Sequence, residues 1–393
     1  MMPLPPAKRC RLSGEPLDGA NVLFELNECP LPGIYPESAQ TSLGLMSPLR
    51  VVQACDSGFV QLGHVFDSSL YKHYAFAGGG AGAYRQHLQW FSGEIEDRFC
   101  TTSSILEVGC GDGYLLRELR NRGFTDVFGI DPSRAASQEA CSWLVNGFFP
   151  NDLPSGQRDK RYDLVICRHV LEHIEWPLPF MQALASALKV EGELWIEVPD
   201  LDRAVERGMW SNFYQLHCNY FSALTLDRLA AKAGLRCVGA ALVEVFGGSL
   251  LRRYVTGNPE ALAPAPQLEG VAAKIEAYCG QLRRVVSDLP EGSVGYGAAE
   301  RTAVVIGFAP ALARRLSALY DGNPLLEGRF LAGTGLRIRG KETMYSSPPS
   351  AIVLFAISNA DEILREWKSR LSGDLLVIVP GGEFSVQTLS KYG

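Results

Sequence analysis

The sequence predicts an α/β protein with a mostly parallel sheet covered on both faces, and a second, smaller α/β unit near the C-terminus. Short apolar strands alternate with helical segments between residues 84 and 257. A glycine-rich loop, 109–113, follows the first of these strands and opens a helix. A linker rich in proline and alanine, 258–266, precedes another strand–loop–helix unit. We therefore divide the chain into a small N-terminal module, a central domain and a C-terminal domain, at 1–80, 81–257 and 258–393.

Composition favours a reduced, cytoplasmic protein. The 393 residues carry 37 Lys and Arg against 43 Asp and Glu, a net charge of −6. Such a chain lacks the excess of positive charge that attracts phosphate backbones or anionic lipid. Neither nucleic acid nor a membrane is therefore an expected partner. No apolar run reaches the ~18 residues that span a bilayer, and no secretory leader is visible. The ten cysteines form no Cys-x-x-Cys pair, which argues against a disulfide scaffold and favours buried thiols.

The N-terminal module has the weakest pattern. Residues 1–50 are rich in proline, show no helical period and are predicted to be irregular. Residues 51–63 read as short strands around a turn. The run Gly78-Gly-Gly-Ala81 then provides a hinge before the next domain.

The central domain alternates the periods of strands and helices. Its expected helices lie near 88–99, 114–121 and 179–190, and its expected strands near 104–108, 127–130, 162–167 and 193–198. Two-sided burial of these strands predicts a mostly parallel sheet.

The C-terminal domain opens with a long amphipathic helix, 268–289. Buried strands near 351–357 and 374–379 bracket a helix at 360–371. The loop Gly295-Tyr-Gly-Ala-Ala begins like a nucleotide loop, but Glu300 stands where a third small residue is expected. A nucleotide site and a scaffold role both remain open here; the cations available to a diphosphate are Arg252, Arg253 and Arg301.

The glycine loop carries the strongest functional signal. Glycines let the backbone turn tightly and let a ligand approach closely. Asp131 ends the second strand, where a carboxylate can accept hydrogen bonds from two ribose hydroxyls. The spacing is E-x-G-x-G-x-G, from Glu107 to Gly113, whereas a dinucleotide loop has G-x-G-x-x-G. A dinucleotide site and a ligand-free scaffold are the alternatives.

This spacing resembles the first motif of the S-adenosylmethionine (SAM) dependent methyltransferases with a Rossmann-like, class I fold. Gly129-Ile-Asp131-Pro and the segment from Tyr162 to Ile174 resemble the next motifs of that family. The resemblance implies SAM as cofactor. It implies cofactor contacts from Glu107, Gly109, Cys110, Gly111, Gly113, Asp131, Pro132, Arg168 and His169. His169 and His173 have the spacing of a metal pair, but the resemblance makes them structural residues of the cofactor loop, and no metal is expected.

Almost the whole chain resembles the C-methyltransferases that act on nucleotide-linked keto-deoxysugars. The matching segments include 47–63, Tyr220-Phe-Ser and Gly295-Tyr-Gly-Ala-Ala. The resemblance implies a small-molecule substrate, such as a nucleotide-linked sugar of antibiotic or glycan biosynthesis. It implies Tyr74 and His87 as substrate contacts. An O- or N-methyltransferase of a natural product, and a SAM-binding partner protein without turnover, are the other hypotheses.

The sequence departs from this subfamily at two sites. The subfamily binds zinc with two Cys-x-x-Cys pairs. Here Cys10 and Cys55 remain, while Ser13 and Gly58 occupy the partner positions. We expect a metal-free module; the alternative is a site completed by Cys29, His64 or His73.

The second departure concerns catalysis. The subfamily has a Tyr-x-Glu-His cluster in which the histidine is the candidate base. This chain keeps Tyr214 and His217 but has Leu216 in place of the glutamate. We expect His217 to act as the base, with Tyr214 or Tyr220 as a hydrogen-bond donor on the same face of a helical turn. The alternative is a packed core histidine, because a base usually has an orienting partner.

Overall fold

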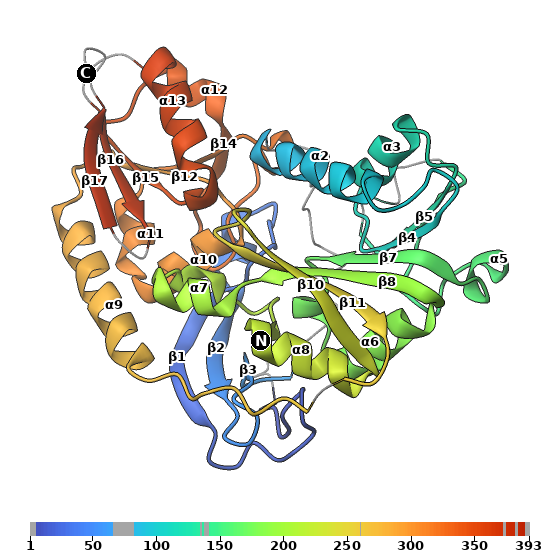
Figure 1. Ribbon diagram of the computed structural model, residues 1–393. Helices are drawn as coiled ribbons and strands as arrows, with labels where there is room; N and C mark the ends of the chain where they lie inside the picture. The colour runs from blue at the N-terminus through green and yellow to red at the C-terminus, as the bar shows by residue number, and fades with distance from the viewer. Residues whose placement is uncertain are drawn as a thin grey trace.

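Three sheets organise the molecule. The computed structural model describes residues 5–65, 82–133, 136, 141–259, 261–371, 375–381 and 384–389. Among these residues, the strands form sheets of four, seven and six strands, with the four-stranded sheet at the bottom of the view in Figure 1 and the six-stranded sheet at its upper left. The predicted α/β class, with a second α/β unit at the C-terminal end, is confirmed.

The seven-stranded central sheet has the order β10-β11-β8-β7-β4-β5-β6. Strands β8 to β6 in this order run parallel, and β11 and β10 extend the sheet antiparallel. All five residues of β4 are buried, as a strand covered on both faces requires. The strands are β4 (Ser104–Val108), β5 (Asp126–Asp131), β6 (Leu144–Asn146), β7 (Tyr162–Arg168), β8 (Leu188–Pro199), β10 (Leu235–Val243) and β11 (Ser249–Thr256).

Helices cover both faces of this sheet. In Figure 1, α2 (Gly82–Glu96) and α3 (Tyr114–Asn121) lie above it, and α6 (Pro177–Ser186) and α8 (Ala223–Lys232) lie below it. Helix α3 buries Leu115, Leu116 and Leu119 on one side, which is the spacing of an amphipathic helix. Shorter helical elements lie in the connections: α5 (Ser155–Arg158), η3 (Leu171–His173), α7 (Leu201–Glu206) and η4 (Trp210–Asn212).

The N-terminal sheet corrects the prediction that residues 1–50 are irregular. Strand β1 (Asn21–Pro30) pairs antiparallel with β2 (Met46–Gln53), and α1 (Ala39–Leu43) lies between them. Strand β3 (Val60–Leu62) follows, and β9 (Asn219–Tyr220) of the central region completes the sheet. The prolines lie mostly outside β1 or at its end, where no ladder N–H is lost. Pro48, in contrast, lies within β2. A high density of prolines therefore did not mean the absence of strands.

The C-terminal sheet has the order β14-β13-β12-β15-β16-β17, with only β17 antiparallel. Its strands are β12 (Val294–Tyr296), β13 (Leu319–Asp321), β14 (Ile338–Gly340), β15 (Ala351–Leu354), β16 (Leu375–Pro380) and β17 (Phe384–Leu389). Its helical elements are α9 (Val271–Asp288), α10 (Glu300–Phe308), α11 (Ala311–Arg315), η5 (Pro324–Leu326), α12 (Lys341–Ser346), η6 (Ile357–Asn359) and α13 (Ala360–Arg370).

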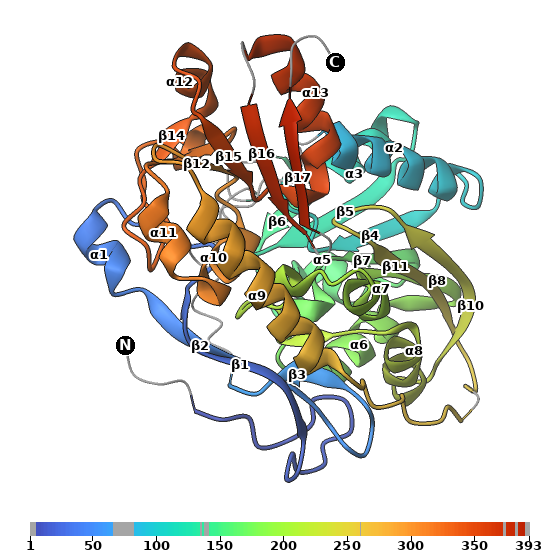
Figure 2. The ribbon, with the colours of Figure 1, turned by 90° about the vertical axis from the view of Figure 1, so that its left-hand side faces the viewer.

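One hydrophobic core joins all three regions. It includes Leu49 of β2, Phe213 of the central region and Leu282 of α9, all essentially inaccessible to solvent. Figure 2 shows α9 crossing the molecule between the C-terminal and the N-terminal sheets. The Tyr278 ring of α9 packs on Phe308 and Phe384. The C-terminal domain is therefore held by packing against the rest of the chain.

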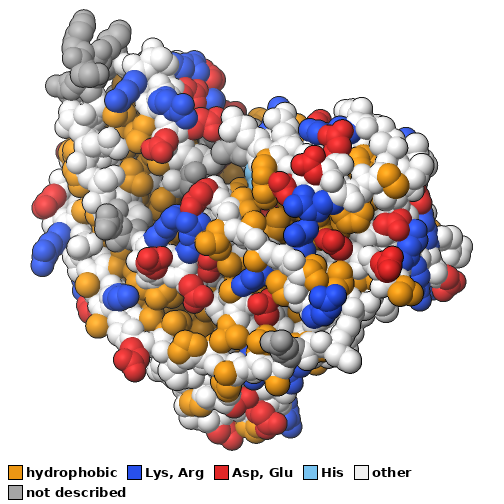
Figure 3. Space-filling model, in the orientation of Figure 1, with side chains coloured by type: hydrophobic (Ala, Val, Ile, Leu, Met, Phe, Trp, Pro, Cys, Tyr) orange, Lys and Arg blue, Asp and Glu red, His pale blue; other side chains and the backbone are white. Residues whose placement is uncertain are grey.

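Charged side chains of both signs lie on the surface. On the face drawn in Figure 3, acidic and basic side chains are interspersed among the described residues. None of the helices in the described part of the chain is long and apolar enough to cross a membrane.

Candidate functional site

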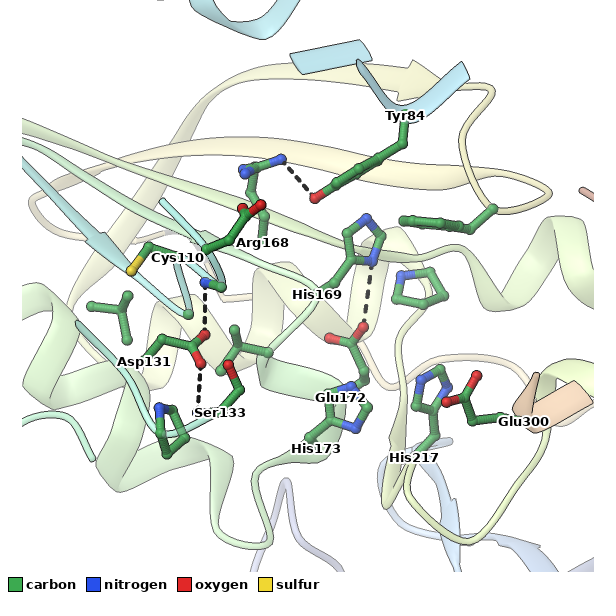
Figure 4. Close-up of a pocket in the computed structure, with 18 of the residues that line it drawn as sticks. Tyr84, Cys110, Asp131, Ser133, Arg168, His169, Glu172, His173, His217 and Glu300 are labelled. Atoms are coloured by element: carbon green, nitrogen blue, oxygen red, sulfur yellow. Dashed lines mark hydrogen bonds and ion pairs between the residues drawn. The ribbon is translucent and has the colours of Figure 1, made fainter. Parts of the chain in front are cut away.

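A cavity of about 440 Å³ lies between the central and C-terminal sheets. Residues that follow β4, β5 and β7 line one side, and residues that follow β12 and β15 line the other. Ligands of open α/β sheets bind at the carboxyl ends of the strands. The cavity faces the carboxyl ends of strands from two sheets, so both contribute to it. Figure 4 shows the polar side chains around it.

The glycine loop forms one wall of this cavity. Gly109 has a φ of +81°, and a Cβ there would lie 2.0 Å from a methyl carbon of Val170. Gly111 has a φ of +56°, and a Cβ there would meet no atom within 4 Å. The first glycine is required for packing and the second leaves open space for a ligand. Cys110 also lines the cavity, whereas Gly113 caps α3 and is not among the described lining residues.

Asp131 supports the loop from the end of β5. Its Oδ2 accepts a hydrogen bond from the Gly111 N–H at 2.9 Å, and its Oδ1 accepts one from the Ser133 N–H at 2.7 Å (Figure 4). A carboxylate has about four lone-pair sites, so these bonds leave capacity for a ligand. Asp131 and Pro132 both line the cavity.

Glu107 and Arg168 form a buried ion pair beneath the loop. Arg168 Nη2 donates to Glu107 Oε1 at 2.7 Å, and the Glu107 side chain is fully buried. Burial raises the pKa of Glu107, and the Arg168 guanidinium opposes that rise. Arg168 lines the cavity and donates to the Tyr84 hydroxyl at 3.2 Å. Within the described residues Glu107 is not a lining residue, so its position supports the Arg168 side chain from below.

His169, Glu197 and His87 form a second buried cluster. His169 Nε2 lies 3.2 Å from Glu197 Oε1, and His87 Nε2 lies 2.9 Å from Glu197 Oε2. Burial alone would lower the pKa of His169, but hydrogen bonds to Glu172 and Glu197 raise it to about 9. His169 is therefore a cation on the cavity wall. His87, predicted to contact substrate, is bound to Glu197 and stacked on Trp90, and is not among the described lining residues.

Tyr214 and His217 lie together on the cavity wall. The Tyr214 hydroxyl is 2.6 Å from His217 Nε2, and His217 is 6% exposed. Burial, together with His173 and Arg301, holds the pKa of His217 well below its usual range. Burial and Glu300 raise the pKa of Tyr214 well above its usual value. The pair thus consists of a neutral imidazole and a protonated phenol, which can act as a base and a hydrogen-bond donor.

The segment that carries this pair is not the expected helical turn. The His217 N–H donates to the Tyr214 carbonyl at 3.0 Å, and the chain then enters β9. Tyr220 lies on β9: its hydroxyl donates to the Tyr214 carbonyl, its ring is 6.3 Å from the His217 ring, and both Tyr220 and His217 line a second, small pocket. The expected helical turn is therefore wrong, although both phenol rings lie beside the His217 ring. Leu216 is buried in the core, so this turn supplies no carboxyl group.

The other predicted residues lie elsewhere. Tyr74, His73 and the run 78–81 lie outside the described residues. Cys10 is buried and 3.3 Å from the Ser57 hydroxyl, whereas Cys55 is exposed and donates to the Gly19 carbonyl. A Cβ at Gly58 would lie 2.1 Å from the Ala265 carbonyl oxygen. The linker to the C-terminal domain thus occupies the space that a cysteine at 58 would need.

One group of described residues has potential metal ligands close together. Single ligand atoms of Glu172, His173 and His217 lie within 4.8 Å of one another. His217 Nε2 is already bonded to the Tyr214 hydroxyl, and His173 Nδ1 donates to the Leu216 carbonyl at 2.8 Å. His169 and His173, the pair that the sequence spacing suggested, are therefore not the residues whose ligand atoms lie close together. Residues 171–173 form a 3₁₀ turn, and it is Glu172 and His173 that lie near His217.

Several cavity residues were not assigned to the site from the sequence. Glu172 comes from η3 and Phe246 from the loop before β11. Phe246 packs edge-on against His169 at a ring distance of 4.9 Å. Glu300 comes from the start of α10, next to Arg301, which was expected as a possible contact of a diphosphate. The sequence carried one signal for Glu300: it interrupts the small residues of its loop. Arg252 and Arg253 lie on β11 and pair with Asp227 of α8 and Glu193 of β8; neither arginine is among the described lining residues of the cavity.

Comparisons with known proteins assign this geometry to a reaction class. Residues 73–240 match the model described as "Methyltransferase domain", and residues 260–380 match the "C-methyltransferase C-terminal domain". The chain is a SAM-dependent methyltransferase. Within it, the two matched regions supply the two sides of the cavity.

The methyltransferase is similar to known proteins over different lengths. It is 23% identical to the C-methyltransferase NovU of Streptomyces niveus, over 95% of this chain and 96% of that one. It is 36% identical to a tRNA U34 carboxymethyltransferase of Idiomarina loihiensis, over 47% of this chain and 61% of that one. A solved magnesium protoporphyrin IX methyltransferase from Synechocystis PCC 6803, with bound SAM, matches 44% of this chain and 80% of that chain at 16% identity and a TM-score of 0.34.

The residues of the methyltransferase fit SAM as cofactor. Gly111 faces open space on the cavity side of the loop, where a ligand can approach the backbone closely. Asp131 presents its carboxylate at the end of β5, the position that binds ribose hydroxyls in this type of fold. The groups available to hold SAM are therefore the backbone and side chains of the loop 109–112, together with Asp131 and Pro132.

Proposed function

We propose that this methyltransferase transfers a methyl group from SAM to a carbon atom beside the keto group of a nucleotide-linked deoxysugar. One observation carries the proposal: the Tyr214–His217 pair lines the same cavity as Asp131 and the glycine loop. A carbon acceptor needs a proton removed beside a carbonyl, whereas an oxygen or nitrogen acceptor already has a lone pair. A neutral base beside a phenol donor meets that need.

His217 and Tyr214 can take different roles in the reaction, His217 as the base and Tyr214 as the hydrogen-bond donor. The Asn212 backbone hydrogen-bonds the His217 ring, and Nε2 faces the Tyr214 hydroxyl. This arrangement fits a ring with its proton on Nδ1 and a lone pair on Nε2. When the substrate enters, Nε2 takes the proton from the carbon, and the C–H electron pair moves toward the carbonyl oxygen.

Tyr214 stabilises the charge that then develops. Its hydroxyl turns from Nε2 to the substrate oxygen and donates a hydrogen bond to the forming enolate. SAM, when bound, supplies an electrophilic methyl group for the enolate carbon, which must lie about 3 Å away. The imidazolium afterwards returns its proton to solvent.

Similarity over nearly the full length supports carbon as the atom that is methylated. NovU is named as a C-methyltransferase, and it matches 95% of this chain. The C-terminal domain adds Arg301, a half-buried cation, to the cavity, and a nucleotide-linked sugar carries phosphates that such a cation can bind. We also propose domain boundaries at 1–80, 81–257 and 258–393, and a cytoplasmic location.

Methyl transfer from labelled SAM tests this proposal. Purified protein is incubated with a panel of nucleotide-linked keto-deoxysugars, a phenol and an amine. We expect label in a keto-sugar, at carbon. Label in the phenol or amine alone would replace the proposal with O- or N-methylation. No transfer to any acceptor, despite SAM binding, would favour a partner protein without turnover.

A further inference from the structure

Glu300 brings a carboxyl group into the cavity from the opposite sheet. It is the first residue of α10, directly after the loop that ends β12. It lines the cavity together with Tyr214 and His217. In the view of Figure 4, its carboxyl group lies next to the His217 ring. Residues more than eighty positions apart in the sequence thus line the same cavity.

Glu300 differs from the other acidic side chains of the cavity in its bonding. Asp131 binds two backbone N–H groups, and Glu172 lies 3.4 Å from the His169 ring. Asp112 accepts from the Tyr114 N–H and pairs with Arg117. Among the described residues, Glu300 has a hydrogen bond only to its own backbone N–H. Its carboxyl group is therefore available to the cavity.

The surroundings of His217 are otherwise unfavourable for a positive charge. The titratable and charged groups around it are His173, His169, Arg301, Tyr214, Tyr220, Glu172 and Glu300. His173, Arg301 and His169 each disfavour the imidazolium, after burial itself. A base that takes up a proton needs a compensating negative charge nearby. The turn that carries His217 has the buried Leu216 and no carboxyl group of its own.

We propose that Glu300 is a positioning residue of the active site: its carboxylate acts through the Tyr214–His217 pair and stabilises the His217 imidazolium formed during catalysis. The proposal rests on the proposed function of that pair. Glu300 interacts electrostatically with Tyr214, whose hydroxyl is 2.6 Å from His217 Nε2. The step balances because the proton leaves the substrate carbon for Nε2, and the Glu300 carboxylate takes up no proton and only offsets the new charge. Burial raises the pKa of Glu300, and the neighbouring Arg301 guanidinium opposes that rise. The C-terminal domain thereby completes the active site.

A structural role for Glu300 is the alternative, because an acidic residue in the first turn of a helix stabilises the helix through its dipole. Glu362 provides a matched control. It lies in the first turn of α13, is exposed, and is not among the described residues that line the cavity. A dipole effect alone would make Glu300→Gln and Glu362→Gln behave alike.

The first test needs no substrate. The chain has six histidines, so 15N-histidine NMR with His217→Ala identifies the His217 signals. We expect Glu300→Gln to change the His217 Nε2 shift at pH 7.5 and to lower the pH at which the ring protonates, because a negative charge is lost. Glu362→Gln leaves both unchanged. A His217 signal that is the same in wild type and Glu300→Gln overturns the proposal, whatever the acceptor of the methyl group proves to be.

The second test uses turnover on the keto-sugar that the wild type methylates. We expect Glu300→Gln to lower kcat at least tenfold, with SAM affinity unchanged, and to move the acidic limb of the pH profile to lower pH. Glu300→Asp, which keeps the charge, restores part of the rate and stands in if the Gln variant does not fold. Equal kcat values in wild type and Glu300→Gln, or an equal loss in Glu362→Gln, overturn the proposal. If the wild type methylates no keto-sugar, the proposed function fails and the NMR test still decides the role of Glu300.

Discussion

The Tyr214 hydroxyl lies 2.6 Å from Nε2 of His217, and both groups line the cavity that the glycine loop borders. A short bond between a phenol and a neutral imidazole places a donor and a base side by side. This relationship leads to the first prediction.

We expect His217→Ala to lower turnover about 100- to 10,000-fold, the usual contribution of a general base. Tyr214→Phe should lower it about 100-fold, because one donor to the enolate is lost. Calorimetry with SAM should give the same affinity for both variants and wild type, since neither residue belongs to the glycine loop. Near-normal turnover of His217→Ala would reduce His217 to a packing residue.

Asp131→Asn tests the cofactor site. Loss of a charged acceptor weakens SAM binding about 10- to 100-fold, because a hydrogen bond to a charged group contributes ~1.5–3 kcal/mol. Calorimetry with SAM and with its demethylated product measures the effect. Asp126→Asn, at the other end of the same strand, pairs with Lys160 away from the cavity and should bind SAM normally. Equal affinities for the two variants would contradict the assignment.

The His169 cation links stability to pH. Its pKa is raised to about 9 in the folded protein, above the ~6.5 of an unfolded chain. The stabilisation is therefore complete below pH ~6.5 and is lost as the pH rises through about 9. Its size is on the order of 3 kcal/mol. Urea unfolding of wild type and His169→Gln should give a difference in free energy that shrinks between pH 7 and pH 10. A constant difference would contradict the charged state of His169.

Gly58→Ala should destabilise the N-terminal module. The new Cβ would lie 2.1 Å from the Ala265 carbonyl oxygen, at a φ of +70°. Crowding and the left-handed conformation together cost about 2–5 kcal/mol. Gly14→Ala is the control: its φ is +83°, but no atom lies within 4 Å of the added carbon, so its cost should be only ~1–2 kcal/mol. Thermal or urea unfolding compares them, and equal losses would rule out the clash.

Removal of metal ions tests the Glu172–His173–His217 group. We expect EDTA treatment to leave turnover unchanged, because His217 must keep Nε2 free to take a proton, and a metal ligand could not. Metal analysis of the purified protein provides the parallel measurement. Loss of turnover with EDTA, reversed by a divalent cation, would instead make this group a metal site.

Local sequence predicted much of the central and C-terminal sheets. The run 104–108 is apolar and is followed by glycines, so its strand and loop follow from neighbouring residues alone. The helices near 114–121 and 268–289 were likewise visible in their apolar spacing. In contrast, β1 was missed because prolines flank it, and its stability comes from pairing with β2, which no local pattern reports.

The sequence alone determined the glycine loop, the carboxylate of Asp131 and the presence of Tyr214 and His217, because each depends on short-range spacing. Only the tertiary structure decided which side chains meet around them. It joined His87 to Glu197, bonded the Tyr220 hydroxyl to the Tyr214 carbonyl, and brought Glu300 to the opposite wall of the cavity. These contacts arise where elements far apart in the chain pack together. Their geometry depends on burial and strand order, which the spacing of residues along the chain does not encode.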